Sequence, residues 1–490
     1  MVCDNVRYRT HPPAMFDCHD LVISRNLRLT FERKMRLLVP NTEREAAMRS
    51  TGLMALLWLG LSFVGPAAAQ TSPPEIAFRN VRVFDGARLT LSEPTSVLVR
   101  GNKIVTIGQI AAAPGATVIE GAGRTLMPGL IDAHVHLMMS SLPQIALLTS
   151  DIGFVNIVAA QSATEMLMRG FTSVRDLGGP SFGLKKAIDS GVVAGPRIWP
   201  SGAMISQTGG HGDFRLPTEL PAAPDAFGYT DRIGAAAIAV DEATVRKRAR
   251  EQLALGATQI KLMAGGGVSS HYDPLDVAQF TVSELRAAVE AAENWGTYVT
   301  VHAYTPRAVR QAIEAGVMCI DHGHLLDDAT AKLMADKGIY WSMQPFGDDG
   351  RSSFAEGSAN RAKQLTMFAG TDTAYALARK YKLKTAWGTD ILFDPEAAAL
   401  QGEWLARMVK WYSPAEALQI ATSQNAELLA LSGPRSPYPG KLGVIEAGAL
   451  ADLLLVDGDP TRDLTLVANP AKNFVVIMKD GKIYKNMLAK

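Results

Sequence analysis

The pair His134 and His136 is the first feature of this 490-residue sequence that suggests chemistry. The two histidines end an apolar run, LIDAHVH, which has the composition of a buried β-strand. Side chains two residues apart on a strand point to the same face, so both imidazoles are directed to one point. Neutral imidazole binds zinc, iron, nickel or cobalt. A His-x-His pair alone is a weak signal, but the setting PGLIDAHVH strengthens the prediction of a metal site.

Lys261 lies in the apolar segment QIKLMAGGG, where a lone buried ammonium group would be costly. Two interpretations are open. Either the head group reaches a carboxylate, or the amine is carboxylated and the carbamate offers two oxygens to two metal ions. Gly265, Gly266 and Gly267 follow directly, which would let a substrate approach the backbone closely.

Three more candidate ligands end apolar segments further along the chain. His302 and His322 each offer one ring nitrogen, and Asp390 closes the segment KTAWGTD. A buried carboxylate is expensive unless it meets a cation, so a place beside a metal ion would suit Asp390. There it would also take the proton of a bound water. All histidines from His134 onward end predicted strands or lie in the loops just after them, which indicates one shared site.

The segments that carry these residues alternate with helical patterns such as TVSELRAAVEAAENWG and ATAKLMADKG. This alternation predicts the α/β fold class, and eight strand–helix units over about 300 residues fit a TIM (β/α)8 barrel. The carboxyl ends of barrel strands build the active site. A doubly wound sheet is the alternative, but no GxGxxG turn follows an early strand. The eight predicted strands are residues 130–136, 172–176, 197–202, 259–265, 298–304, 319–324, 340–346 and 384–390.

Two β-rich stretches flank this middle part of the chain. Residues 76–127 and 440–490 contain β-branched segments separated by Gly, Asn and Asp turn residues. We predict that they meet in one small β-sandwich beside a barrel domain of residues 128–439. Within the barrel, residues 205–239 are too long and too rich in Gly and Pro for an ordinary connection, which predicts an active-site lid.

Residues 48–69 have the pattern of a secretory signal peptide. A basic residue precedes an apolar run over residues 53–64, and three alanines offer a cleavage site. The run is shorter than the roughly 20 residues that a membrane span needs, so a membrane anchor is the less favoured alternative. We expect translation to start at Met48, with residues 1–47 as a spurious or disordered leader. The mature protein would be secreted or periplasmic, with no membrane span after signal cleavage.

Composition limits the classes of partner. The net charge is +1, so no overall field favours nucleic acid or an anionic membrane. The apolar fraction of 47% is ample for a large core. Of the three cysteines, only Cys319 lies downstream of Met48, which excludes an internal disulfide in the expected mature chain.

Together these residues resemble the amidohydrolase superfamily, from residue 76 to the end of the chain. The resemblance rests on the split β-rich ends, the PGLIDAHVHL segment and the lysine of the fourth strand. It also includes the histidines of the fifth and sixth strands and the aspartate of the eighth. The segments SQTGGHGD, HAYTPRAVRQAIEAG and DHGH are similar to the imidazolonepropionase-like branch. That branch includes Xaa-Pro dipeptidase-like enzymes and secreted amidases that hydrolyse ochratoxin.

The resemblance implies a ligand set and a mechanism. The two divalent metal ions would be zinc by family analogy. A water between them would have a lowered pKa and act as nucleophile, and the second ion would stabilise the oxyanion. Asp390 would accept the water's proton and pass it to the leaving amine. His134, His136 and Asp390 would bind the more buried ion, His302 and His322 the second, and Lys261, as N6-carboxylysine, would bridge them.

Candidate substrate contacts are His211, Tyr304, His324, His271 and Gly266. His211, in a Gly-rich loop, would reach the reacting carbonyl or a substrate carboxylate. Tyr304 stands two residues after a predicted ligand, on the same strand face, and would donate to the oxyanion. His324 has the same relation to the ligand of the sixth strand. His271 would face the pocket unless its segment, SSHYDP, is only a surface turn.

We therefore expect a binuclear-metal hydrolase that cleaves small amides: dipeptides or N-acyl amino acids, including ochratoxin A-like amides. Export favours this function, because scavenging peptides or detoxifying amides makes sense outside the cytoplasm. Hydrolysis of cyclic amides or lactones is the alternative, although imidazolonepropionase is cytosolic and lacks the strand-four lysine. A non-catalytic metal or small-molecule binding protein would show a broken ligand set, and no expected ligand is missing here. Related enzymes often assemble, so a homo-oligomer is the weaker expectation.

Overall fold

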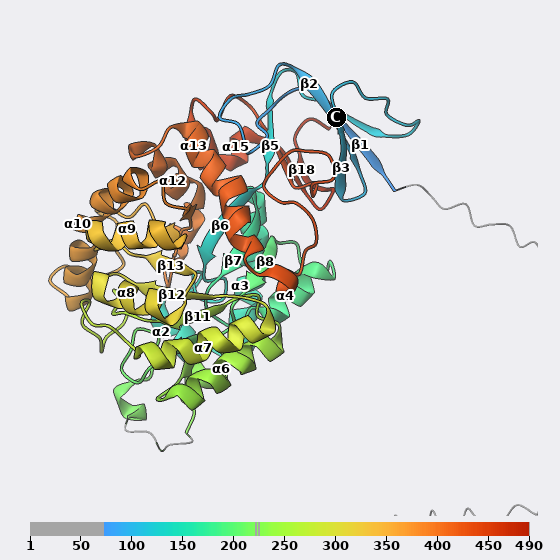
Figure 1. The fold of residues 1–490 in the computed structure, drawn as a ribbon. Helices are drawn as coiled ribbons and strands as arrows, with labels where there is room; N and C mark the ends of the chain where they lie inside the picture. The colour runs from blue at the N-terminus through green and yellow to red at the C-terminus, as the bar shows by residue number, and fades with distance from the viewer. Residues whose placement is uncertain (1–72, 221–222, 224–225, 490) are drawn as a thin grey trace, which may run out of the picture. The chain divides into compact units, whose positions relative to one another are not determined.

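The structure is a computed structural model that describes residues 73–220, 223 and 226–489 (Figure 1). The predicted leader and signal peptide lie outside these residues, so export stays a prediction. Within the described range, no helix combines the length and the apolar character that a membrane crossing requires.

Strands from both ends of the described chain form one eight-stranded sheet. Its order is β18-β17-β16-β5-β1-β2-β3, with β4 paired to β1. One face buries an apolar core that includes Phe78, Val97, Leu453 and Val476. The two ends therefore share a sheet, and its division into the two layers of a sandwich stays a prediction. The strands are β1 (Glu75–Val83), β2 (Thr95–Arg100), β3 (Lys103–Ile107), β4 (Thr117–Glu120), β5 (Thr125–Pro128), β16 (Leu453–Val456), β17 (Phe474–Lys479) and β18 (Lys482–Asn486).

The middle of the chain contains a strand at each of the eight predicted positions, all parallel to their neighbours. β6, β7 and β8 form one sheet, and the order of the second sheet is β10-β9-β11-β12-β13-β14-β15. These strands are buried along their length, as expected where helices cover a parallel sheet. The eight are β6 (Leu130–Val135), β7 (Phe171–Asp176), β8 (Arg197–Pro200), β11 (Ile260–Met263), β12 (Val299–Ala303), β13 (Cys319–His322), β14 (Tyr340–Met343) and β15 (Thr385–Trp387).

Helices follow most of these strands and lie outside them (Figure 1). The side chain of Thr281 caps the first turn of α7 (Val282–Trp295), and Gly296, in the left-handed region, follows its last residue. The α-helices are α2 (Gln144–Thr149), α3 (Ile152–Met168), α4 (Phe182–Asp189), α5 (Tyr229–Arg232), α6 (Glu242–Leu255), α7 (Val282–Trp295), α8 (Pro306–Ala315), α9 (Asp328–Lys337), α10 (Ala359–Lys380), α11 (Pro395–Ala399), α12 (Gln401–Ala406), α13 (Pro414–Gln419), α14 (Asn425–Ala430) and α15 (Pro470–Asn473). Short 3-10 or π turns are η1 (Pro217–Glu219), η2 (Arg407–Lys410), η3 (Ile420–Gln424), η4 (Gly433–Arg435) and η5 (Leu464–Ala468).

The parallel strands are not paired into one closed ladder. Among the described residues, strand pairing joins neither β8 to β9 nor β15 to β6. Single backbone bonds link the segments around these gaps. The Thr258 amide, just before β11, donates to the Pro200 carbonyl at the end of β8, and the Asp390 amide, just after β15, donates to the His134 carbonyl of β6, each at 2.8 Å. The register of β6 against β7 also shifts twice, as at a β-bulge. Bulges of this kind change the direction of side chains and are common next to active sites. The α/β architecture is therefore as predicted, whereas continuous closure into a barrel is not seen in the ladder.

The stretch predicted as a lid is partly sheet. β9 (Met204–Ser206) and β10 (Ala236–Ile238) pair with each other in parallel, and β9 also pairs with β11. Each of these two strands has only three residues and flanks a Gly- and Pro-rich stretch, so the sequence pattern did not reveal them.

Candidate metal centre and active site

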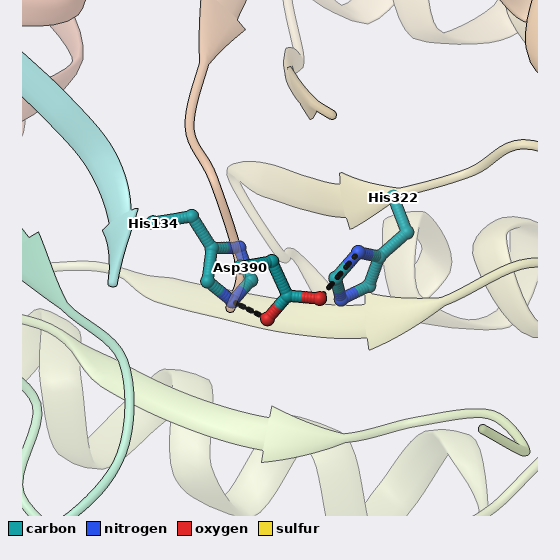
Figure 2. A group of neighbouring side chains, drawn as sticks. All are labelled: His134, His322 and Asp390. Atoms are coloured by element: carbon teal, nitrogen blue, oxygen red, sulfur yellow. Dashed lines mark ion pairs between the residues drawn. The ribbon is translucent and has the colours of Figure 1, made fainter. Parts of the chain in front are cut away.

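Three side chains from distant parts of the chain meet in a buried group (Figure 2). His134 comes from β6, His322 ends β13, and Asp390 follows β15. One ligand atom of each lies within 4.8 Å of the others. His134 Nε2 is 3.0 Å from Asp390 Oδ1, and His322 Nδ1 is 3.7 Å from Asp390 Oδ2. Imidazole nitrogens gathered around one carboxylate form a donor set that suits a divalent metal ion.

His136 joins this group, as its spacing from His134 predicts. Its Nε2 lies 3.0 Å from the same Asp390 oxygen. Its other ring nitrogen is buried and has no hydrogen-bond partner in the part of the chain that the structure describes. The two imidazoles of the His-x-His pair thus converge on a single carboxylate oxygen.

The backbone at two of these residues is in an uncommon conformation. His322 has φ of 76° and Asp390 has φ of 50°, the left-handed region that residues with a Cβ rarely adopt. Such backbone costs about 1–3 kcal/mol per residue and persists where surrounding contacts enforce it, often at functional sites. Here it turns both side chains toward the same point.

His302 lies beside the centre but has another partner. Its ring centroid is 4.4 Å from that of His322, and its Nε2 is 3.0 Å from the Gly266 carbonyl oxygen. On its other side it stacks on His211, with 4.0 Å between the ring centroids. The structure therefore places His302 within the site, and its role as a ligand stays a prediction.

Lys261 is paired with a carboxylate beneath the histidines. Its Nζ lies 2.7 Å from Asp321 Oδ2, and its side chain is 1% exposed. This is the first of the two arrangements that the sequence left open. Burial alone would raise the pKa of Asp321, but the charges of Lys261 and Arg175 hold it well below its usual range. Asp321 Oδ1 also lies 3.3 Å from His134 Nδ1, so the pair contacts the candidate centre.

Arg175 and Asp321 were not predicted as site residues. Arg175 on β7 is fully buried and donates to Asp321 Oδ1 at 2.7 Å and to the Ala133 carbonyl at 2.6 Å. Asp321 precedes His322 on β13. Both are charged residues within apolar strands, and a buried charge requires a partner. That pattern was the available signal.

Replacing Arg175 by methionine should destabilise the protein strongly. Asp321 would remain buried with one cation fewer, and removal of one partner of a buried pair costs about 3–5 kcal/mol. The matched control is Arg310→Met, because Arg310 forms an ion pair with Asp327 that is half exposed. Exposed pairs contribute about 0–1 kcal/mol. Urea denaturation of both variants measures the difference, and equal losses would contradict the structural role of Arg175.

Electrostatics favour neutral imidazoles around a charged carboxylate. Burial lowers the pKa of His136, and burial lowers those of His302 and His322 well below the usual range. His134 is the exception, because Asp390 and Asp321 outweigh its burial and raise its pKa. Burial would raise the pKa of Asp390, yet His134 and His322 hold it well below its usual range. Neutral imidazoles keep the lone pairs that a metal ion needs.

A cavity of about 670 Å³ reaches this group at Asp390. Its floor includes His211, His302, Tyr304 and Asp390. The size and the apolar character are typical of a site for small molecules. Aromatic side chains from several segments form much of the wall, namely Phe346, Phe354, Phe368, Phe393 and Trp404.

Two of the predicted substrate contacts line this cavity. His211 stacks on His302, and burial lowers the pKa of His211 to about 4, against the attraction of Asp273. Tyr304 is 3% exposed, and burial raises its pKa well above the usual range, so its phenol stays protonated.

The other three predicted contacts are not among the residues that line this cavity. His324 is buried behind Phe346, with 5.3 Å between the ring centroids, and its Nε2 lies 2.9 Å from the Gln344 carbonyl. His271 is exposed, as a surface turn would place it. A Cβ on Gly266 would meet the Pro274 carbonyl at 1.9 Å, so its own loop, rather than a substrate, requires this glycine.

Gln344 is a further site residue that the sequence pattern did not indicate. Its Oε1 lies 2.7 Å from His322 Nδ1, which orients this imidazole. Partners of this kind fix the ring position and tautomer of ligand histidines. A glutamine just past β14 has no pattern that separates it from other buried amides.

The model of the amidohydrolase family matches residues 125–489 of the chain. The chain belongs to the amidohydrolase family. Ochratoxinase of Aspergillus niger is 32% identical over 387 residues, which cover 74% of this amidohydrolase and 75% of the ochratoxinase. The superfamily resemblance found in the sequence is thereby confirmed.

Solved structures agree with this membership. A prolidase complexed with N-methylphosphonate-L-proline has a TM-score of 0.76 and 34% identity, covering 84% of this amidohydrolase and all of that chain. The crystal structure of A. niger ochratoxinase has a TM-score of 0.74 and 26% identity, covering 86% and 97%. This amidohydrolase is therefore a hydrolase with relatives that act on amide or peptide bonds, and its family typically binds a metal.

Proposed function

We propose that this amidohydrolase hydrolyses small amides that carry an aromatic or other bulky apolar group, such as N-acyl aromatic amino acids and ochratoxin-like amides. Dipeptides are the second substrate group. The observation that carries this proposal is the convergence of His134, His136 and His322 on Asp390, which itself lines a cavity with an aromatic wall. The ochratoxinase and prolidase relatives support it.

The donor set fits divalent metal ions. We assign His134, His136 and Asp390 to one ion, and His302 and His322 to a second, with zinc as the first choice for imidazole and carboxylate. Lys261, carboxylated on Nζ, would bridge them after release from Asp321. When bound, such ions supply a nucleophilic water at neutral pH and polarise the scissile carbonyl. The unmet hydrogen-bonding capacity of His136 and the crowding of three imidazoles around one carboxylate support this fit.

The side chains of the cavity have distinct parts in this reaction. Asp390 is ionised and accepts a proton at its carboxylate, then returns it to the leaving nitrogen. The protonated phenol of Tyr304 donates to the developing oxyanion. His211, held against His302, faces the same space and contacts the substrate carbonyl or carboxylate. The aromatic wall excludes water and holds the apolar group.

The same proposal includes the fold and the location. We infer that the two parallel sheets belong to one barrel, and the Asp390–His134 and Thr258–Pro200 backbone bonds between their edge segments support this inference. The signal pattern of residues 48–69 would export the enzyme to the compartment where such amides are met.

A substrate panel tests the function. The zinc-loaded protein would be offered N-acyl-phenylalanine, N-acyl-alanine, Xaa-Pro dipeptides, ochratoxin A and lactones. We expect kcat/KM for N-acyl-phenylalanine to exceed that for N-acyl-alanine at least about 10-fold, because the larger group fills the aromatic wall. Trp404→Ala should shrink this ratio, whereas the control Trp295→Ala, at an exposed tryptophan, should leave it unchanged.

The other outcomes of the panel are also decisive. Hydrolysis of lactones without hydrolysis of any amide would favour the cyclic-substrate alternative. Metal binding with no turnover of any substrate would favour a non-catalytic binding protein. Either result would overturn the proposed function.

A further inference from the structure

Lys363 on α10 makes an unusual set of contacts. Its ammonium group donates to three main-chain carbonyls, those of Gly267 at 3.0 Å and of Ser270 and Asp273 at 2.9 Å each. All three belong to residues 267–273, the first part of the connection between β11 and α7, here called the 267–273 loop. The three donors of an ammonium group are thus matched to three carbonyls of one loop rather than to a carboxylate.

Asn360 adds to this attachment from the preceding turn of α10. Its Nδ2 donates to the Val268 carbonyl at 2.6 Å and to the Ser270 carbonyl at 3.1 Å. Residues three apart on a helix lie on the same face, so Asn360 and Lys363 can bind the loop from one side of α10. Burial against the loop lowers the pKa of Lys363, because the charged ammonium group loses part of its contact with water.

The loop in turn holds His211. The Ser270 hydroxyl lies 2.8 Å from His211 Nδ1, and Asp273 Oδ2 lies 4.0 Å from the same nitrogen. Gly267 packs under the imidazole so closely that a Cβ there would lie 1.9 Å from Nδ1. The Gly267 amide also donates to Asp273 Oδ2 at 2.8 Å, which closes the loop on itself. The position of His211 over His302 therefore depends on the shape of this loop.

We propose that Lys363 and Asn360 are positioning residues, which fasten the 267–273 loop so that it holds His211 against His302 over the floor of the cavity. Neither residue needs to touch the substrate. The inference rests on the proposed function for the role of His211 in the reaction. The attachment itself is a property of the chain and is measurable without any substrate.

The first test measures amide hydrogen exchange of the intact, zinc-loaded protein. Lys363→Met should raise exchange within the 267–273 loop at least about 10-fold, because that loop then opens locally. Lys363→Arg keeps a cation with several donors and should restore most of the protection. The matched control is Lys380→Met, since Lys380 lies on the same helix but pairs with Asp328 at the surface. Unchanged exchange in Lys363→Met would overturn the proposal.

The second test is kinetic and uses the best amide of the panel. Lys363→Met should lower kcat/KM about 10–100-fold, since a small misplacement of a contact residue has effects of this size. In a His211→Ala background the same change should cost less than about threefold, because the two residues act through one contact. An equal loss in both backgrounds would show a general structural role and overturn the proposal.

A milder variant keeps the tests informative if Lys363→Met does not fold. Asn360→Ala removes two of the five donated bonds and should raise loop exchange by a smaller factor. Failure of the proposed function would leave every amide intact in the panel and would not alter the exchange result. The two failures are therefore distinguishable.

Discussion

Lys261→Ala should lose activity and bound metal together. We expect kcat/KM on the preferred amide to fall at least about 10³-fold, since even partners behind the ligands cost 10–100-fold when removed. The reason is the loss of the bridging carbamate that we assign to Lys261. The measurement combines steady-state kinetics with metal analysis of the same purified sample.

The structure also supplies the competing account, in which Lys261 serves only as a partner of Asp321. On that account the variant would be less stable but would retain its metal and most of its activity. Arg175 still neutralises Asp321 in Lys261→Ala, so the variant keeps one of the two cations and is expected to fold. A variant with full metal content and activity within about threefold of the parent would therefore refute the bridging role.

Asp390→Asn should have an effect of similar size on turnover. The substitution keeps the shape of the side chain but removes the negative charge that His134 and His136 share. A positioned general base contributes about 10²–10⁴-fold, so we expect kcat to fall by this factor or more as the ligand is also weakened. Steady-state kinetics at saturating metal concentration measures kcat and limits the contribution of a weaker metal affinity.

Asp394→Asn is the matched control for Asp390. Asp394 lines the same cavity four residues further on, and its side chain caps α11. Its carboxylate accepts a hydrogen bond from the Ala397 amide, which is not part of the candidate centre. Because asparagine caps a helix about as well as aspartate, we expect Asp394→Asn to leave kcat within about threefold of the parent value. An Asp390→Asn enzyme as active as Asp394→Asn would show that Asp390 is not the base.

Local spacing was enough to predict the central residues. The i, i+2 relation of His134 and His136 placed both imidazoles on one face, and both contact Asp390. Apolar runs also located the eight predicted strands, because buried strands have a strong composition signal, whereas the short parallel strands β9 and β10 were missed. The sequence pattern does not show how the edges of two sheets meet. The missing strand pairing at β8 and at β15 was therefore not predicted.

The interactions that sequence reasoning missed depend on residues far apart in the chain. Arg175, Lys261 and Asp321 form one buried network from three strands, and each looked like an isolated charge in sequence. The aromatic wall also depends on distant residues, since Phe346 and Phe393 come from separate connections and Trp404 comes from α12. Gly266 was expected near the substrate, but the nearby Pro274 carbonyl is what excludes a side chain there. Each of these facts requires the fold.

The most direct test of the proposed two-metal site is a metal titration with activity measured on the same samples. The chelated protein would receive zinc in steps, with bound metal measured by mass spectrometry and turnover measured on the preferred amide. We predict that activity is lost on chelation and returns as the protein approaches about two ions per chain. Full turnover with fewer than about 0.1 ions per chain would contradict the account, since the residues around Asp390 would then act without metal.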